Sequence, residues 1–178
     1  IQVGDQMAYS GSPTVIPGEI EAGLFDKFEG GIGQGIAYVD LSQNNEGDFR
    51  KEEYVDAGAD ANEGKTIGWI AGGEWTEYTI NVQTAGNYDM TFRYASGNAN
   101  GGGPFHLEID GENISTDINV PSTSTTNWST WASKTVNNIV LNKGIHVLRI
   151  AFSNGEFNLG KLNFKYASAL SYHPPVAN

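Results

Sequence analysis

Two tryptophans and one asparagine lie in turn-rich segments, where a side chain is free to contact a ligand. Trp69 precedes a Gly-Gly pair, Trp128 follows a Ser/Thr-rich segment, and Asn158 follows a turn at residues 153–156. Aromatic rings stack on the flat C–H faces of pyranose sugars, and amide or carboxylate groups bond the sugar hydroxyls. Three such residues on neighbouring loops would form a slot for a neutral sugar. The alternative, that each Trp belongs to the hydrophobic core, stays open because it is the commoner use of Trp.

A second set of residues could hydrolyse a glycosidic bond. Glu108, Asp110 and Glu112 alternate along one segment, and on a continuous strand they would share one face, as paired glycosidase carboxylates require. However, Asp110-Gly111 is a strong hairpin-turn signal, so the acids would straddle a bend. We interpret them as solvated turn residues. A small glycoside hydrolase using Glu108 and Glu112 is kept as the alternative function.

Other catalytic and metal-binding patterns are missing from the sequence. It contains no G-x-S-x-G motif and no Gly-rich phosphate loop before a helix. His106, His146 and His173 lack the spacing of zinc ligands. Segment 40–48 carries oxygen ligands of the kind calcium prefers, but it lacks the turn glycine and closing Glu of a helix-loop-helix calcium site. We interpret this segment as a solvated loop and leave a structural calcium elsewhere open.

The composition limits the classes of partner. The 178 residues contain 10 Lys and Arg against 21 Asp and Glu, a formal net charge of −11. This balance argues against nucleic acid and anionic membrane surfaces, which attract clustered cations, but not against a neutral ligand. There are no cysteines, whereas eight Tyr, eight Phe and four Trp indicate a folded chain. No apolar run approaches the roughly 20 residues that span a bilayer.

The elements that must position these side chains are strands, because period-2 alternation recurs and helical spacing is almost missing. Strands are expected at about 75–82, 87–95, 105–109, 148–152 and 162–166. Strands with one apolar face bury only that face, so we predict an all-β fold of two antiparallel sheets, a β-sandwich or jelly roll. We expect a linker over residues 1–15, the module over 16–167, and a linker or tail over 168–178.

Trp75 does not fit this alternation. It falls on the polar face of its expected strand, together with Glu77 and Thr79. An exposed Trp requires either a ligand or a covering segment, and both explanations stay open.

An ordered series of short motifs resembles carbohydrate-binding module family 6. The resemblance spans about residues 16–166 and is most specific over Ile67-Gly-Trp-Ile-Ala-Gly-Gly-Glu-Trp-Thr-Glu-Tyr78. The other matching segments are 16–22, 45–56, 92–96, 120–121, 128–131, 144–149 and 157–159.

The resemblance implies a jelly roll whose loop end holds a sugar between two aromatic rings. By motif position, Trp69 and Trp128 are these aromatics and Asn158 bonds the sugar. An acidic residue completes such a site, and the resemblance places it at Glu52 or Glu53, with Glu52 preferred.

The resemblance also implies two further features. Some family members have a second site on the concave face of one sheet, and Trp75 and Glu108 fall at its positions. Many members bind a structural calcium through a Glu-Ala-Glu motif near the start. Here Gly23 replaces the last Glu and Gly160 replaces a polar residue near the end, so Glu21 is the single ligand that can be proposed.

We therefore expect a secreted, monomeric, noncatalytic module that binds a β-linked polysaccharide and holds a parent glycoside hydrolase at its substrate. No cofactor is expected for function. The preferred ligand is β-1,3-glucan (laminarin), followed by mixed-linkage glucan, xylan and agar-type galactan. The start at Ile1 is read as an excised or processed piece. Besides the hydrolase, a structural or adhesion sandwich stays open, and it predicts no sugar binding.

Overall fold

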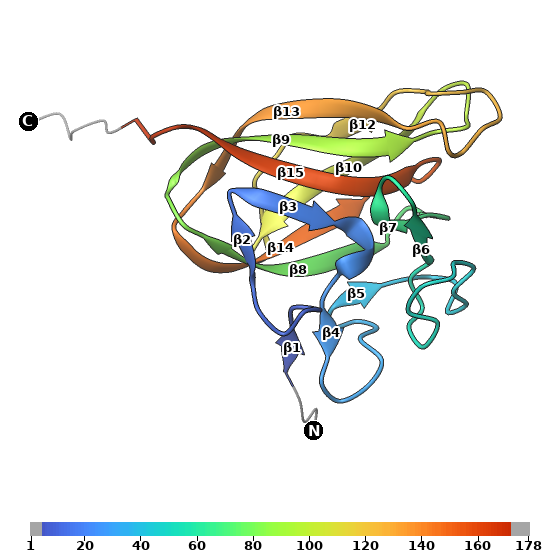
Figure 1. Cartoon of the computed structure of the whole chain (residues 1–178), viewed down its shortest axis with the longest axis horizontal. Helices are drawn as coiled ribbons and strands as arrows, with labels where there is room; N and C mark the ends of the chain where they lie inside the picture. Colours follow the sequence, from blue (N-terminus) through green and yellow to red (C-terminus); the bar gives the residue numbers. More distant parts are fainter. Residues whose placement is uncertain (1–4, 172–178) are drawn as a thin grey trace, which may run out of the picture.

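Two packed β-sheets form the molecule in the computed structural model, which describes residues 5–171 (Figure 1). The first sheet has the order β11-β10-β14-β8-β2, with β12 beside β10 and β5 beside β8. The second has the order β13-β9-β15-β7-β6, with β3 beside β15, and β1 pairs with β4 in a small separate ladder. The bounds are β1 Gln6–Met7, β2 Thr14–Ile16, β3 Gly18–Glu21, the 3₁₀ helix η1 Ala22–Leu24, β4 Lys27–Phe28, β5 Tyr38–Val39, β6 Ala57–Asp60, β7 Gly64–Ile67, β8 Trp75–Val82, β9 Gly86–Ala95, β10 Gly102–Ile109, β11 Glu112–Asn113, β12 Ile118–Val120, β13 Ala132–Leu141, β14 Gly144–Phe152 and β15 Asn158–Ser168.

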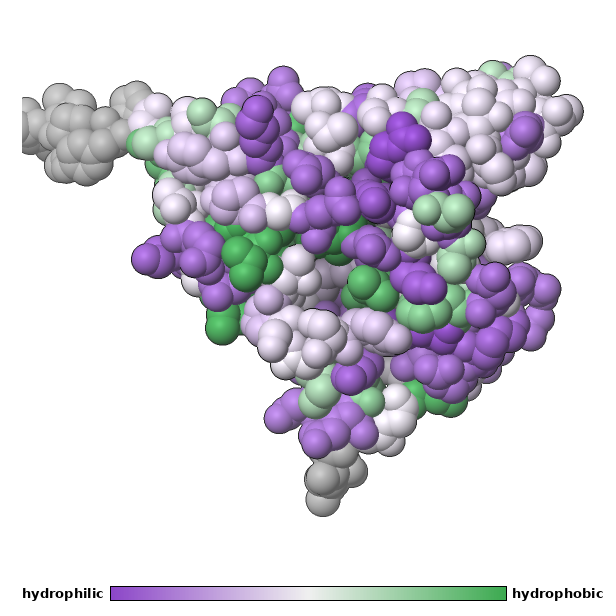
Figure 2. All heavy atoms as spheres, viewed as in Figure 1, coloured by the Kyte–Doolittle hydropathy of each residue, from purple (hydrophilic) through white to green (hydrophobic). Residues whose placement is uncertain are grey.

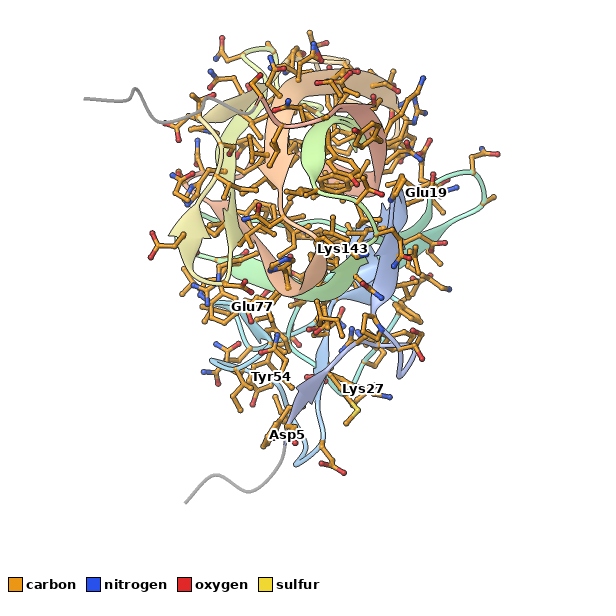
Figure 3. All side chains as sticks on the ribbon, turned by 90° about the vertical axis from the view of Figure 1, so that its left-hand side faces the viewer. Asp5, Glu19, Lys27, Tyr54, Glu77 and Lys143 are labelled. Atoms are coloured by element: carbon orange, nitrogen blue, oxygen red, sulfur yellow. The ribbon has the colours of Figure 1, made fainter. Side chains whose placement is uncertain are left out.

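The core lies between the sheets, where the apolar faces of the strands meet (Figure 3). In β9 buried and half-buried residues alternate, as the sequence predicts for a strand with one apolar face. Phe92 of β9 and Phe105 of β10 come from opposite sheets, and their ring centroids are 5.2 Å apart in an edge-to-face arrangement. The predicted all-β sandwich is confirmed.

One strand pair differs from the expected antiparallel pattern. β2 runs parallel to β8, with Val15 opposite Asn81. Residues 17–74 separate the two strands, and a connection of this length allows a parallel pair, whereas a two-residue hairpin would not.

Residues 5–15 are part of the domain, although residues 1–15 are expected to form a linker. Ala8 is buried, β2 joins the first sheet, and the Gln6 amide donates hydrogen bonds to Asp26 (3.0 Å) and Glu77 (2.8 Å). The polar, Gly-rich composition of this segment does not indicate these contacts, because they are made with residues far away in the sequence. At the other end β15 ends at Ser168, close to the predicted boundary, and residues 172–178 lie outside the described part.

A lobe between η1 and β6 extends below the two sheets in Figure 1. Its centre is Arg50, whose guanidinium lies 3.6 Å from the centroid of the Phe25 ring and 3.5 Å from the carboxylate of Glu53. Glu53 also accepts hydrogen bonds from the Tyr38 hydroxyl (2.6 Å) and the Gly33 amide (3.1 Å). A buried cation is tolerated when it is paired and hydrogen-bonded in this way, so the lobe is fixed by a polar centre.

Most of the face shown in Figure 2 is hydrophilic, and hydrophobic residues form separate small groups on it. Over residues 5–171 the structure has no helix with the length and hydrophobicity needed to cross a bilayer.

Replacement of Asp56 by Asn tests the burial of the segment that leads into β6. Burial raises the pKa of Asp56 from 3.8 to about 6, against a hydrogen bond from the Glu46 amide and with a contribution from the nearby Asp40 carboxylate. The folded-state pKa exceeds the unfolded one, so ionisation lowers stability as the pH rises from about 4 to about 6. Asp56→Asn should therefore raise the free energy of unfolding by about 1–3 kcal/mol at pH 8 and change it little at pH 4.

Urea unfolding at the two pH values measures this difference, with exposed Asp117→Asn as the control for loss of one surface charge. An equal effect of Asp56→Asn at pH 4 and pH 8 would show that Asp56 is not a destabilised carboxylate.

Candidate functional site

Four neighbouring strands of the second sheet bring the predicted loop residues to one end of the sandwich. In the order β13-β9-β15-β7, Trp128 precedes β13, Gly97 follows β9, Asn158 begins β15, and Trp69 follows β7. The register aligns these ends, because Asn158 lies opposite Ala95 and the next residue of β15 pairs with the last residue of β7. Residues that are up to 89 positions apart in the sequence therefore meet at one sheet end.

Trp69 extends into solvent from the loop after β7. Ile67 and Ile70 are buried, whereas 67% of Trp69 is exposed. Its φ of 46° is uncommon for a bulky residue, and the amide of the preceding Gly68 is held by a 2.9 Å hydrogen bond to the Asp56 carbonyl. The two isoleucines anchor the loop, so the indole is turned outward.

Trp128 lies with one ring face on the backbone of Gly97. A Cβ at Gly97 would lie 2.8–2.9 Å from three atoms of the indole, which is closer than real Cβ contacts. Glycine is therefore required for this packing. With 40% of Trp128 exposed, one face of its ring is supported by the main chain and the remainder is available for contact.

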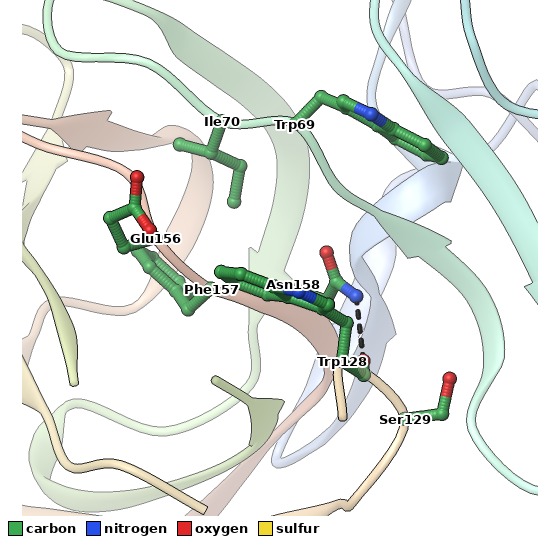
Figure 4. Close-up of a pocket in the computed structure, with 7 residues that line it drawn as sticks. All are labelled: Trp69, Ile70, Trp128, Ser129, Glu156, Phe157 and Asn158. Carbon is green, nitrogen blue, oxygen red and sulfur yellow. Dashed lines mark hydrogen bonds between the residues drawn. The ribbon is translucent and has the colours of Figure 1, made fainter. Parts of the chain in front are cut away.

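Asn158 connects the two aromatic loops. Its Nδ2 donates a 2.8 Å hydrogen bond to the backbone carbonyl of Trp128. On the other side, its Oδ1 would lie 2.7 Å from a Cβ added at Gly68, the residue before Trp69. Figure 4 shows the Asn158 carboxamide between the two indole rings. Asn158 thus sets the spacing between the loops as well as presenting a polar group.

These residues surround a pocket of about 550 Å³. A cavity of this size falls within the range typical of small-ligand sites. The seven lining residues are Trp69, Ile70, Trp128, Ser129, Glu156, Phe157 and Asn158.

Glu156 lines the pocket, although no motif in the sequence singles it out. The sequence predicts the end of a turn at this position, yet the Glu156 side chain faces the pocket and accepts a 3.0 Å hydrogen bond from Asn98. No local pattern identifies it, because Glu156 lies in a bend with a φ of 68°, where the alternation of a strand does not apply.

The two acids expected in the loop site lie elsewhere. Glu53 is 6% exposed, and its carboxylate is engaged by Arg50 and Tyr38 inside the lobe. Glu52 is exposed, and neither residue lines the pocket. The prediction of an acid from this segment is therefore wrong for Glu53 and finds no support for Glu52, because the segment folds into the lobe beside the sandwich.

Trp75 and Glu108 lie on the outer face of the first sheet, where Arg149 connects them. The Arg149 guanidinium stacks on the Trp75 ring at 3.9 Å from its centroid, pairs with Glu77 at 2.6 Å and approaches Glu108 at 3.7 Å. The structure thus brings together the two residues of the predicted second site, and Arg149 covers Trp75, which explains a Trp on this face without a ligand. Binding at this face remains a prediction.

The carboxylates of the alternative hydrolase are not arranged as a catalytic pair. Asp110 and Gly111 form the predicted hairpin turn, with φ of 52° and 87°. The register places Glu112 opposite Ile109 and Glu108 opposite Asn113, so the two glutamates point to opposite faces of the sheet. Because they are on opposite faces, Glu108 and Glu112 cannot flank one glycosidic bond.

The described histidines have structural hydrogen-bond partners. His106 bonds to Glu108 (2.9 Å), and His146 bonds to Asp110 (2.7 Å) and to the Asn142 carbonyl (3.0 Å). His173 lies outside the described residues. Neither His106 nor His146 is among the residues that line the pocket.

Glu21, the expected calcium ligand, accepts a 2.7 Å hydrogen bond from the Lys65 amide. Within residues 5–171 no three His, Cys, Asp or Glu side chains gather as metal ligands. Calcium also takes backbone carbonyls as ligands, so Glu21 as a calcium ligand stays a prediction, and no part of the function is assigned to this ion.

Comparisons with known proteins agree with this geometry. The sequence profile described as "Carbohydrate binding module (family 6)" matches residues 47–166. No curated protein matches the chain.

Several solved structures share the fold. The C-terminal family 6 module of LamC, a marine laminarinase from Zobellia galactanivorans, is 23% identical, with a TM-score of 0.60 over 83% of this chain and 97% of that chain. A β-1,3-glucan binding family 6 module from Bacillus halodurans is 19% identical, with a TM-score of 0.57 over 86% and 99% of the two chains. A family 6 module from Cellvibrio mixtus lichenase 5A, in complex with cellotriose, is 28% identical, with a TM-score of 0.53 over 62% and 84%. The profile match, the shared fold and the aromatic pocket lead to one conclusion: this chain belongs to carbohydrate-binding module family 6.

Proposed function

We propose that the chain binds a neutral β-linked polysaccharide in the pocket between Trp69 and Trp128, and that its role is to hold an attached glycoside hydrolase at the substrate. The observation that carries the proposal is the pair of exposed indoles on either side of the pocket, with the Asn158 carboxamide between them (Figure 4).

The physical chemistry of the two rings favours a sugar. Exposed indoles leave apolar surface in water, and a ligand that covers them gains hydrophobic and stacking energy. A pyranose offers flat C–H faces to both rings, while its hydroxyls remain available to Asn158 and Glu156. A purely apolar ligand would leave the amide and carboxylate of these residues without partners.

Charge narrows the choice of polysaccharide. The net charge of −11 and the carboxylate of Glu156 in the pocket disfavour uronate-rich or sulfated chains. We place β-1,3-glucan first, since a relative of the same fold comes from a laminarinase and another is named as β-1,3-glucan binding. Mixed-linkage glucan, xylan and agar-type galactan follow.

Weak binding by one module is sufficient for this role. Covalent attachment of a binding module raises the effective concentration of a catalytic domain at its substrate. We expect the chain to act as a monomer in an extracellular enzyme, where insoluble polysaccharides are met.

Trp128→Ala is the direct test of the pocket. Loss of one of the two aromatic rings that stack on the sugar should weaken binding at least about 30-fold, equivalent to about 2 kcal/mol. The melting temperature should stay nearly unchanged, because the Trp128 ring is partly exposed. Affinity electrophoresis in native gels containing laminarin, mixed-linkage glucan, xylan or agarose measures the effect. Ile145→Ala removes an exposed apolar side chain outside the pocket and serves as the matched control.

Selective retardation of the wild-type chain that is lost in Trp128→Ala and kept in Ile145→Ala supports the proposal. Unchanged retardation of Trp128→Ala would reject the pocket as the binding site, and no retardation of the wild-type chain in any gel would favour the structural or adhesion sandwich.

Gly97→Ala tests whether ring position, and not merely the presence of Trp128, determines binding. The added methyl group would occupy the space of the indole ring, so the ring must move while every ring atom is kept. We expect the Trp128 indole N–H peak in a ¹H–¹⁵N spectrum to shift and the affinity to fall about tenfold or more.

Gly58→Ala serves as the control, because a Cβ there would make only ordinary contacts, at 3.4 Å from the Thr66 side chain and 3.7 Å from the Asp48 side chain. Neither Gly58 nor Gly97 has a positive φ, so the two substitutions differ in the contact with the ring and not in backbone strain. An unshifted indole peak with full affinity in Gly97→Ala would contradict the packing described for Trp128.

A further inference from the structure

Glu156 is the single ionisable residue among those that line the pocket. It lies at the end of the Trp128 ring opposite to Asn158 (Figure 4). The pocket therefore has an amide at one end and a carboxylate at the other, with aromatic surface between them.

The structure holds Glu156 in an unfavourable backbone conformation. Its φ is 68°, a region that costs free energy for residues with a long side chain and persists where neighbouring groups fix it. The Ser96 hydroxyl donates a 2.7 Å hydrogen bond to the Glu156 carbonyl, and the preceding Gly155 carbonyl accepts a 2.8 Å bond from the Gly103 amide.

The carboxylate is oriented but not neutralised. Asn98 Nδ2 donates to one of its oxygens at 3.0 Å, and none of the ion pairs found in the described residues includes Glu156. A positioned carboxylate with free acceptor capacity at the edge of a pocket is suited to accept hydrogen bonds from a ligand.

We propose that Glu156, held by Asn98, is the acidic hydrogen-bond acceptor of this site and selects neutral sugars over anionic ones. The inference rests on the proposed function, because it assigns a role within the same pocket. It gives Glu156 the place that the sequence assigned to Glu52 or Glu53.

An ionised carboxylate accepts hydrogen bonds and donates none, so its partners must be donors such as sugar hydroxyls. Hydrogen bonds from hydroxyls to a carboxylate are charge-assisted and stronger than those between neutral groups. Two adjacent hydroxyls of one pyranose ring can approach the same carboxylate. A uronate or sulfate group at this position would instead meet a like charge.

The test compares Glu156→Gln with Glu29→Gln. Both substitutions remove one negative charge from an exposed glutamate, but Glu29 lies in the lobe and outside the pocket lining. The probes are laminarin and sulfated laminarin. If another of the four polysaccharides retards the wild-type chain, that polysaccharide and its sulfated derivative take their place.

We expect Glu156→Gln to bind the neutral polysaccharide about tenfold more weakly than the wild-type chain and to gain retardation by the sulfated derivative at low salt. Glu29→Gln should match the wild-type chain on both probes. Thermal unfolding of each variant separates loss of binding from loss of fold.

Three results would overturn the inference. If Glu156→Gln equals Glu29→Gln on both probes while Trp128→Ala abolishes binding, Glu156 has no role, although the proposed function stands. If Glu52→Gln gives the tenfold loss and Glu156→Gln gives none, the acid of the site is Glu52. If the wild-type chain binds none of the four polysaccharides, the proposed function and the inference fail together.

Discussion

The hydrogen bond from the Asn158 side chain to the Trp128 carbonyl joins two segments that lie 30 positions apart in the sequence. Asn158 begins β15, the strand that lies between β9 and β7 in the second sheet. One side of its carboxamide holds the Trp128 loop, and the other side lies against Gly68 beside Trp69. The width of the pocket is therefore set by one side chain on a strand that is fixed on both edges. A site built in this way is ordered before a ligand arrives, which lowers the entropy lost on binding.

Close backbone contacts keep the pocket open. Trp128 rests on Gly97, where a methyl group would occupy the space of the ring, and Gly68 leaves room for the Asn158 oxygen. Trp69 and Glu156 both have positive φ values, so each is directed by a conformation that its residue type disfavours. Exposed apolar rings would otherwise fold back onto the protein surface to leave water. These constraints oppose that collapse at the place where a ligand would cover the rings.

The lobe and the outer sheet face show how polar groups serve stability beside the site. Arg50 and Glu53 form a buried pair between the rings and carbonyls of the lobe. Arg149 covers Trp75 and pairs with the glutamates beside it. In both places a cation stacks on an aromatic ring and pairs with a carboxylate. These contacts explain the burial of Glu53 and the position of Trp75 without a ligand. The contrast with Glu156, which has a neutral partner and an open pocket beside it, separates structural acids from an acid free to bind.

The fold and most of the loop site could be predicted from the sequence, because they depend on local patterns. Alternation in β9 and the Asp110-Gly111 turn report directly on strand faces and hairpins, and short ordered motifs located Trp69, Trp128 and Asn158. Three features could not be predicted in this way. The N-terminal strand β2 has a polar surrounding sequence and is defined by its pairing with β8. Glu53 is indistinguishable from its neighbour until Arg50 is placed beside it. The sequence around Glu156 indicates only a turn, and its place in the pocket depends on the start of β15 lying next to Trp128.

The sequence by itself therefore determined the all-β class, the aromatic and amide chemistry of the site and the acidic charge that disfavours anionic partners. The tertiary structure decided which acid lies in the pocket, which acids are buried, and that Glu108 and Glu112 face opposite ways. The physical reason is that strand periodicity and turn propensity act over a few residues. The surroundings of a carboxylate, in contrast, are set by contacts between segments that the chain separates by tens of positions.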